Sequence, residues 1–89
     1  VGVIYDPMHD EIFSAIRGQG CLVNGEPAYV SSIGVLADAI IALDLGRSEV
    51  VRRQSTTAML QLAHNVRSLR TIGSAALTLA WVAAGRVDA

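Results

Sequence analysis

Polar and apolar residues alternate at the start of the chain in a pattern that predicts a β-hairpin. Residues 1–5 are rich in β-formers and end at Asp6-Pro7, which opens a turn because proline fixes its own φ and disfavours helix at the preceding residue. Residues 11–16 then alternate polar and apolar side chains, as expected for a half-buried strand. The two segments are therefore expected to pair in antiparallel fashion.

The hairpin is followed by signals for two more short strands. A glycine-containing turn leads to a strand at 21–23, and Asn24-Gly25 is a strong two-residue hairpin signal because both positions tolerate positive φ. A further strand is expected around 28–30. Four strands in about thirty residues predict an antiparallel β-meander over residues 1–32.

The hydrophobic period changes after residue 32. Residues 36–39 suggest a short helical segment, and the nearly continuous apolar run at 40–45 predicts a strand buried on both faces. Residues 49–66 place apolar side chains on one face at helical spacing, and Ser48 is a plausible N-cap. The pattern therefore predicts a strand followed by an amphipathic helix.

A second strand and helix are expected in the last third of the chain. Residues 67–72 have strand character, Ser74 is a plausible N-cap, and residues 75–84 form a helical pattern that Gly85 ends. The helix is apolar all round, so it is expected to lie buried between layers. Residues 86–89 are expected to begin another strand.

These elements predict a layered α/β protein in which the meander precedes a β-α-β-α portion spanning residues 33–89. The composition adds a further expectation: the chain is 52% hydrophobic over 89 residues, which is high for a soluble chain of this length. Both ends have the character of cut ends. We therefore expect a single incomplete domain with part of its surface covered by other protein.

The charge is small overall and unevenly distributed. The net charge is −1, with −5 in residues 1–46 and +4 in residues 47–89. The small net charge argues against a nucleic-acid-binding surface. Every basic residue is arginine, which excludes a catalytic lysine in this chain. The arginine excess is open to three interpretations: solvated helix faces, an anionic ligand, or a subunit contact.

Cysteine usage and hydropathy bear on location. Cys21 is the single cysteine, and no secretory leader precedes it, so a reducing cytoplasm is expected. The longest apolar run, at 75–84, is shorter than the roughly 20 residues that a membrane-spanning helix needs. We therefore expect no membrane association.

The most informative chemical feature is the strand that runs into Gly73-Ser74 and a helix start of small residues. Such a helix start leaves free N–H groups at the positive end of the helix dipole, where hydroxyl or phosphate oxygens can bind. The alternative interpretation is an ordinary turn and cap. Other candidates are weaker: His9 and His64 have no metal-ligand spacing, Cys21 has no activating neighbour, and Ser74 lacks a nucleophile-elbow motif.

Two sets of motifs resemble the central part of the inositol monophosphatase family. Residues 70–89 follow the pattern R-x-x-G-S-A-A-L-x-L-A-x-V-A-x-G-R-x-D-A, which resembles the family's segment before its Trp-Asp metal motif. Gly-Val-Ile-Tyr-Asp-Pro at 2–7, with Arg-Gly-Gln-Gly at 17–20 and Asn-Gly-Glu-Pro at 24–27, resembles its meander. The resemblance implies a fragment of the five-layer αβαβα sugar and inositol phosphatase fold.

The resemblance implies a Mg²⁺-dependent phosphomonoesterase acting on inositol monophosphate or a related small polyol phosphate. The family's metal motifs, Glu-Glu, Asp-Pro-Ile-Asp-Gly-Thr and Trp-Asp, are absent from residues 1–89. The chain is therefore expected to carry no metal ligand and no catalytic residue, and to be inactive by itself. Alternatives are a histidinol-phosphate or fructose-1,6-bisphosphate phosphatase of the same fold, or a non-catalytic homologue acting as an interaction module.

The resemblance also implies site residues and an oligomeric state. Gly73, Ser74 and Ala75 match the family's substrate-binding Gly-Ser/Thr-Ala element. The possible site-lining residues are those of the preceding strand end and the residues after it: Asp44, Gly46, Arg47 and Ser48. Arg47 stands where the family usually has a small or hydroxyl residue, so the substrate class stays open. A homodimer is usual in the family.

Overall fold

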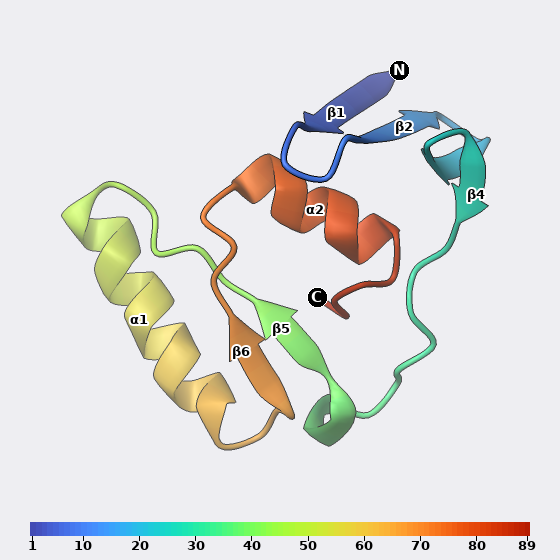
Figure 1. Cartoon of the computed structure of the whole chain (residues 1–89). Coiled ribbons are helices and arrows are strands. Elements are labelled where there is room, and N and C mark those ends of the chain that lie inside the picture. Colours follow the sequence, from blue (N-terminus) through green and yellow to red (C-terminus); the bar gives the residue numbers. More distant parts are fainter.

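A computed structural model describes residues 1–89 and confirms the antiparallel meander (Figure 1). Its four strands pair in sequential order: β1 (Gly2–Asp6), β2 (Glu11–Ile16), β3 (Gly20–Val23) and β4 (Glu26–Ala28). The β1–β2 register pairs Ile4 with Phe13, so these side chains share the face of the sheet that packs on a helix. Ile12 and Ile16 lie on the opposite face and are exposed, so the strand is half-covered as predicted, but its sequence does not show which face is covered.

The turn between β3 and β4 has the geometry that its sequence predicts. Asn24 and Gly25 have φ values of 50° and 82°. The Asn24 side-chain oxygen also accepts a hydrogen bond from the Ile12 amide at 2.8 Å, which ties the turn to β2. Because the turn is only two residues long, β4 starts at once, two residues earlier than the predicted strand at 28–30.

The second half of the chain forms the predicted β-α-β-α arrangement. After a 3₁₀ turn, η1 (Leu36–Asp38), the elements follow in the order β5 (Ile40–Ala42), α1 (Glu49–Ala63), β6 (Ser68–Arg70) and α2 (Ala75–Ala83). The strands β5 and β6 pair in parallel, with Ile41 opposite Leu69. Both strands are shorter than the predicted ranges of 40–45 and 67–72, because apolar residues continue past the points where pairing ends.

The residues after α2 return to the free edge of β5. The Asp88 amide donates to the Ile40 carbonyl at 2.9 Å, and the Ala42 amide donates to the Ala89 carbonyl at 2.7 Å. The Asp88 carboxylate also accepts from the Ile40 amide at 2.6 Å. This hydrogen bond, followed by one from Ser31, lowers the pKa of Asp88. Residues 86–89 form no strand, so the predicted further strand is not present, but these hydrogen bonds hold residues 88 and 89 against β5 and fix its start.

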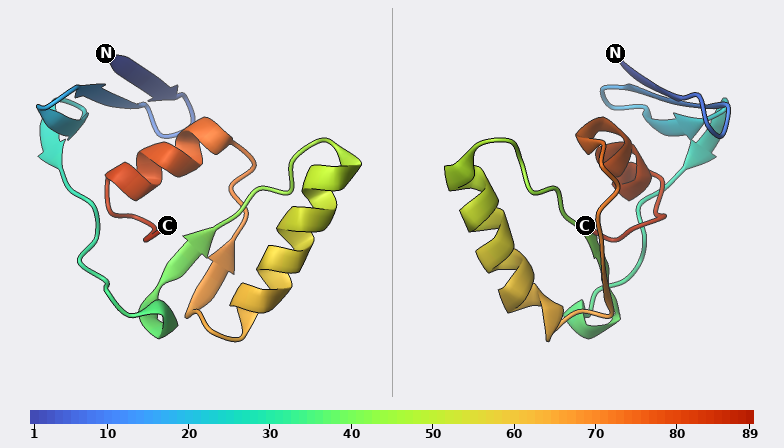
Figure 2. Two further views of the ribbon diagram at one scale, coloured as in Figure 1. Left: turned by 180° about the vertical axis from the view of Figure 1, so that it is seen from behind. Right: turned by 60° about the vertical axis from the view of Figure 1, so that its left-hand side comes forward.

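The helix α2 lies between the meander and the β5–β6 pair (Figure 2). Ala80 on α2 and Phe13 on β2 are both buried. Beyond the helix end, Arg86 forms a two-pronged ion pair with Glu11, with N–O distances of 2.8 and 2.5 Å. Its guanidinium carbon also lies 5.3 Å from the centre of the Phe13 ring. Arg86 thus joins the meander to the end of α2.

Much of the apolar surface is open to solvent within residues 1–89. Only 6 of the 89 residues are buried, which is too few for a closed core, and Leu79 on α2 is 69% exposed. The expectation that α2 is buried on every side is therefore wrong for this chain, because the two sheets cover only part of the helix. Buried Thr78 and Trp81 polar atoms also have no hydrogen-bond partner. No helix has the length and apolarity that crossing a bilayer requires.

We expect Gly85→Ala to destabilise the protein by about 3 kcal/mol, combining strain at positive φ with steric overlap. Gly85 has φ +72°, and an added Cβ would lie 2.6 Å from the Tyr29 carbonyl oxygen. Gly18→Ala is the matched control, because Gly18 has φ +80° but no atom within 4 Å of the added Cβ, so strain alone costs about 1 kcal/mol. Urea denaturation measures both, and equal losses would contradict the backbone contact.

The Glu11–Arg86 pair predicts an acid-dependent contribution to stability. The hydrogen bond from Arg86 lowers the pKa of Glu11 below 4.5, so the carboxylate stabilises the fold above that pH. This stability is lost as the pH falls through the lowered pKa of the folded state. We expect Glu11→Gln to be less stable than the native protein at pH 7, and the difference to shrink below pH 4.5.

Denaturation midpoints measured from pH 7 to pH 3 test this expectation. Glu26→Gln is the control, since Glu26 is exposed and forms no ion pair. A difference for Glu11→Gln that stays constant down to pH 3 would rule out the ionised pair as its cause.

Candidate ligand site at the strand ends

The helices α1 and α2 begin at the same edge of the β5–β6 pair. Because the strands are parallel, their carboxyl ends meet at one edge, and each strand leads through a short loop into its helix (Figure 1). This edge is where layered α/β proteins commonly bind ligands. The fold therefore brings the residues that follow β5 close to those that follow β6.

A hollow of about 410 Å³ lies at this edge. It contains five of the seven site residues named from the sequence and is lined by Asp44, Leu45, Gly46, Arg47, Thr71, Gly73 and Ala75. The other two, Ser48 and Ser74, are the N-caps of the adjoining helices. The structure thus places the two predicted groups of residues around one cavity.

The start of α2 presents free backbone amides beside this hollow. Gly73 takes φ +83°, which glycine accommodates readily, and Ser74 Oγ accepts from the Leu77 amide at 3.3 Å. The Thr78 amide makes the first helical bond, 2.9 Å from the Ser74 carbonyl. The amides of Ala75 and Ala76 precede that bond, and both residues are exposed. These two donors are available to an oxygen-rich ligand.

The loop after β5 is folded onto the first turn of α1. Gly46 has φ +70°, and an added Cβ would lie 2.5 Å from a Val51 methyl group. Arg52 donates to the Gly46 carbonyl at 3.3 Å, and Ser48 Oγ caps the Val51 amide at 3.2 Å. Arg47 takes part in none of these contacts and is exposed. The loop is therefore held in place while the Arg47 side chain stays free for a ligand.

The charges around the hollow favour an anionic ligand. Half-buried Asp44 is the only carboxylate in the lining, which also contains Arg47 and lies at the edge where both helices present their positive ends. None of the lining residues is a histidine, a cysteine or a second carboxylate that could act as nucleophile or general base. The hollow can bind and orient a phosphorylated or hydroxylated ligand, but its residues do not supply hydrolytic chemistry.

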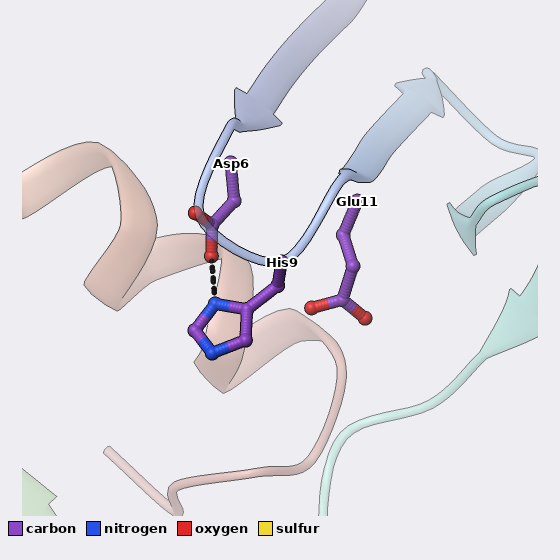
Figure 3. Close-up of side chains that lie close together, drawn as sticks. All are labelled: Asp6, His9 and Glu11. Atoms are coloured by element: carbon purple, nitrogen blue, oxygen red, sulfur yellow. Dashed lines mark hydrogen bonds and ion pairs between the residues drawn. The ribbon is translucent and has the colours of Figure 1, made fainter.

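A separate group of potential metal ligands lies in the β1–β2 turn. The ligand atoms of Asp6, His9 and Glu11 lie within 4.8 Å of one another (Figure 3). His9 Nδ1 lies 2.8 Å from one carboxylate oxygen of buried Asp6, and the other oxygen accepts from the Met8 amide at 3.0 Å. The pKa of Asp6 is lowered, first by the His9 contact. The prediction that His9 has no metal-ligand spacing is therefore wrong, because the structure brings His9 together with Asp6 and Glu11, whereas Asp6 does act as a turn residue.

Neither group of residues fits magnesium. Mg²⁺ takes octahedral oxygen ligands, but the hollow offers a single carboxylate beside a guanidinium. In the turn, both Glu11 oxygens already accept from Arg86, and Asp6 uses both of its oxygens on neighbours. The turn also joins the far end of α2, about 14 Å along the nine-residue helix from the hollow. A magnesium site is not formed by residues 1–89.

The fold and the hollow define a layered α/β chain with a ligand-binding edge, and comparison with known proteins identifies the family. A model of the inositol monophosphatase family matches residues 1–89. The chain belongs to this family. The family contains phosphatases, as the names of its members state.

Named relatives agree over the whole chain. Inositol monophosphatase 1 of Solanum lycopersicum is 42% identical over 99% of this chain, and the inositol-1-monophosphatase of Bacillus subtilis is 39% identical over 100% of it. Nus factor SuhB of Escherichia coli strain K12 is 42% identical over 99% of it. The matched segments are 33%, 34% and 33% of those proteins, so the chain spans about a third of their length.

Solved structures show the same arrangement. The suhB protein of Bartonella henselae superposes with a TM-score of 0.88 at 37% identity, over 97% of this chain and 34% of that one. The inositol monophosphatase of Anabaena (Nostoc) sp. PCC 7120 gives 0.82 at 38% identity, over 98% and 35%. The likeness confirms the predicted phosphatase fold, of which these residues form the meander and the β-α-β-α portion.

The serine caps predict a stability effect separable from ligand binding. We expect Ser48→Ala and Ser74→Ala each to lower the free energy of unfolding by about 1 kcal/mol, because each removes the acceptor for a first-turn amide. Ser→Gly at the same positions should cost only a few tenths of a kcal/mol. Urea denaturation tests this, and equal losses for alanine and glycine would contradict capping as the cause.

Proposed function

We propose that the protein containing this chain is a Mg²⁺-dependent phosphomonoesterase that hydrolyses inositol monophosphate or a related small polyol phosphate. The observation that carries the proposal is the hollow at the strand ends, where two free amides at the start of α2 face the loop after β5. Membership of the inositol monophosphatase family supports it. Residues 1–89 supply part of the substrate-binding surface.

In this proposal the two loops have distinct roles. Gly73, Ser74 and Ala75 bind the substrate: the left-handed turn at Gly73 aims the helix start at the hollow, and the free amides donate to substrate oxygens. The loop after β5 completes the wall through Asp44, Gly46 and Arg47, and Ser48 caps the helix that follows. Asp44 can accept from a ring hydroxyl, while the amides favour an oxygen that carries negative charge.

Catalysis in this proposal depends on protein outside residues 1–89. Magnesium, when bound, would polarise the phosphate ester and lower the pKa of the attacking water. The chain's own residues do not fit the ion, which supports ligands elsewhere in the protein and no activity for the chain alone. Two structural neighbours, at 27% identity, are described with bound calcium, one of them complexed with NADP and Ca²⁺.

A non-catalytic role is the second candidate. One relative, from E. coli and 42% identical, is named as a Nus factor, and this name supports a role other than phosphate release for this chain. The two functions differ in one measurable property, since only the enzyme releases phosphate. An assay of the full-length protein with Mg²⁺ therefore decides between them.

The remaining parts of the proposal concern assembly. Residues 1–32 and 33–89 belong to one incomplete domain, and the exposed outer face of the meander, with Val3, Tyr5 and Ile12, is covered by the rest of the protein. A cytoplasmic homodimer is proposed from the resemblance. The exposed apolar side of α2 supports the proposal that other protein covers this helix. The assignment of residues 1–89 to one incomplete domain is the same whether that protein belongs to the same subunit or to a partner subunit.

We expect the full-length protein to release phosphate from inositol 1-phosphate with Mg²⁺, and Gly73→Ala to lower kcat/KM at least about tenfold. The substitution strains a residue at φ +83° and turns the α2 amides away from the substrate, and tenfold corresponds to about 1.4 kcal/mol of transition-state binding. Phosphate release is measured with and without EDTA.

Gly18→Ala is the matched control for this substitution. Gly18 has φ +80° and the same open surroundings, but it lies in the β2–β3 turn, away from the hollow. Its kcat/KM should stay within about twofold of the native value, since distant surface changes have small effects. Equal losses of kcat/KM in the two variants would show that the start of α2 is not part of the substrate site. If the full-length protein hydrolyses no small phosphate ester, the proposed enzymatic function is wrong.

A further inference from the structure

A second hollow adjoins the candidate site and is lined largely by arginine. Its volume is about 710 Å³, it lies along α1, and no hydrophobic residue lines it. Its lining consists of Arg47, Glu49, Arg52, Arg53, Thr56 and Thr57. Arg47 lines this hollow and the smaller one at the strand ends. The two hollows therefore share one cationic residue.

The three arginines differ in how they are engaged. Arg53 is held by Glu49, with both of its donors on one carboxylate oxygen at 2.7 and 3.2 Å. Arg52 donates to the Gly46 carbonyl at 3.3 Å. Arg47 forms no ion pair and no side-chain hydrogen bond. Arg47 is thus the least committed cation at this boundary, and Glu49 neutralises only the more distant Arg53.

The position of Arg47 is fixed although its side chain is free. The Gly46 turn packs against Val51, and Ser48 caps α1 directly after it, so the backbone on both sides of Arg47 is held. A guanidinium on a fixed backbone can bind a phosphate with two parallel hydrogen bonds. The absence of apolar lining makes this surface unsuitable for an apolar partner.

We propose that Arg47, with Arg52 beside it, binds a second phosphate group of the substrate, so that the enzyme prefers a polyol or sugar bisphosphate to the corresponding monophosphate. This inference rests on the proposed phosphatase function and names its substrate class. One phosphate lies in the hollow at the strand ends, where it is hydrolysed, and the other lies across Arg47 in the larger hollow. The second phosphate is bound at Arg47 and is not hydrolysed.

The test compares two substrates that differ only in the second phosphate. Full-length native protein and Arg47→Gln are assayed with inositol 1-phosphate and with inositol 1,4-bisphosphate. We expect Arg47→Gln to raise KM for the bisphosphate about tenfold, the loss of one charged hydrogen-bonded contact, with kcat nearly unchanged. KM for the monophosphate should rise by a clearly smaller factor, because Arg47 also lines the hollow at the strand ends. Arg47→Lys should restore part of the bisphosphate affinity, since it keeps the charge but loses the two-pronged geometry.

Arg17→Gln serves as the control, because Arg17 is an exposed arginine in the β2–β3 turn, far from both hollows along the chain. Arg17→Gln should leave kcat and KM unchanged for both substrates. Equal effects of Arg47→Gln on the two substrates, or no effect on either, would overturn the bisphosphate assignment while leaving the phosphatase proposal intact.

Calorimetric binding of the same two compounds separates the remaining outcomes. If the protein hydrolyses neither compound, the proposed function is wrong. The binding data then show by themselves whether Arg47 binds a second phosphate. Tighter binding of the bisphosphate that is lost in Arg47→Gln would support the site. Binding of a single-stranded RNA that requires all three arginines, with no preference between the two inositol phosphates, would assign the surface to nucleic acid and overturn the inference.

Discussion

The parallel pairing of β5 with β6 is the constraint on which the candidate site depends. Two parallel strands must be joined by a crossover, and here α1 makes it, so the carboxyl ends of both strands and the starts of both helices come together. Gly46 and Gly73 then turn the chain out of the sheet at positive φ. Without this pairing, residues 44–48 and 73–75 would be unrelated loops. With it, they line one hollow.

Local sequence signals predicted most of the fold because they act over a few residues. Asn24-Gly25 specifies its turn by its tolerance of positive φ, the alternation at 11–16 specifies a strand with one covered face, and Ser48 and Ser74 cap helices that start where predicted. Strand ends were predicted less well at β5 and β6, since an apolar run does not show where pairing stops. The site residues were named from family resemblance, and the spacing of the residues alone would not have joined them.

Contacts between distant side chains could not be predicted from one sequence. The Glu11–Arg86 pair joins residues that are 75 positions apart in the sequence. No local sequence pattern indicates that these two residues form an ion pair. The Asp6–His9 contact is local, and the Asp-x-x-His spacing around a turn is a usable signal for it. The hollow at the strand ends and the hollow along α1 both depend on how the Gly46 loop folds back, which composition does not reveal. The sequence shows the excess of arginine in the second half of the chain, but it does not show that three of these arginines line one hollow.

The contact between Asp88 and the start of β5 has a consequence for the order of folding. It joins residues 48 positions apart, whereas the meander is built from hairpins between neighbouring segments. Contacts of such long sequence separation close slowly, and a chain emerging from the ribosome gains its last residues late. The meander can therefore form while synthesis continues, but β5 acquires its final neighbour only after Asp88 has left the ribosome. The start of β5, where Asp88 binds Ile40, therefore matures later than the meander.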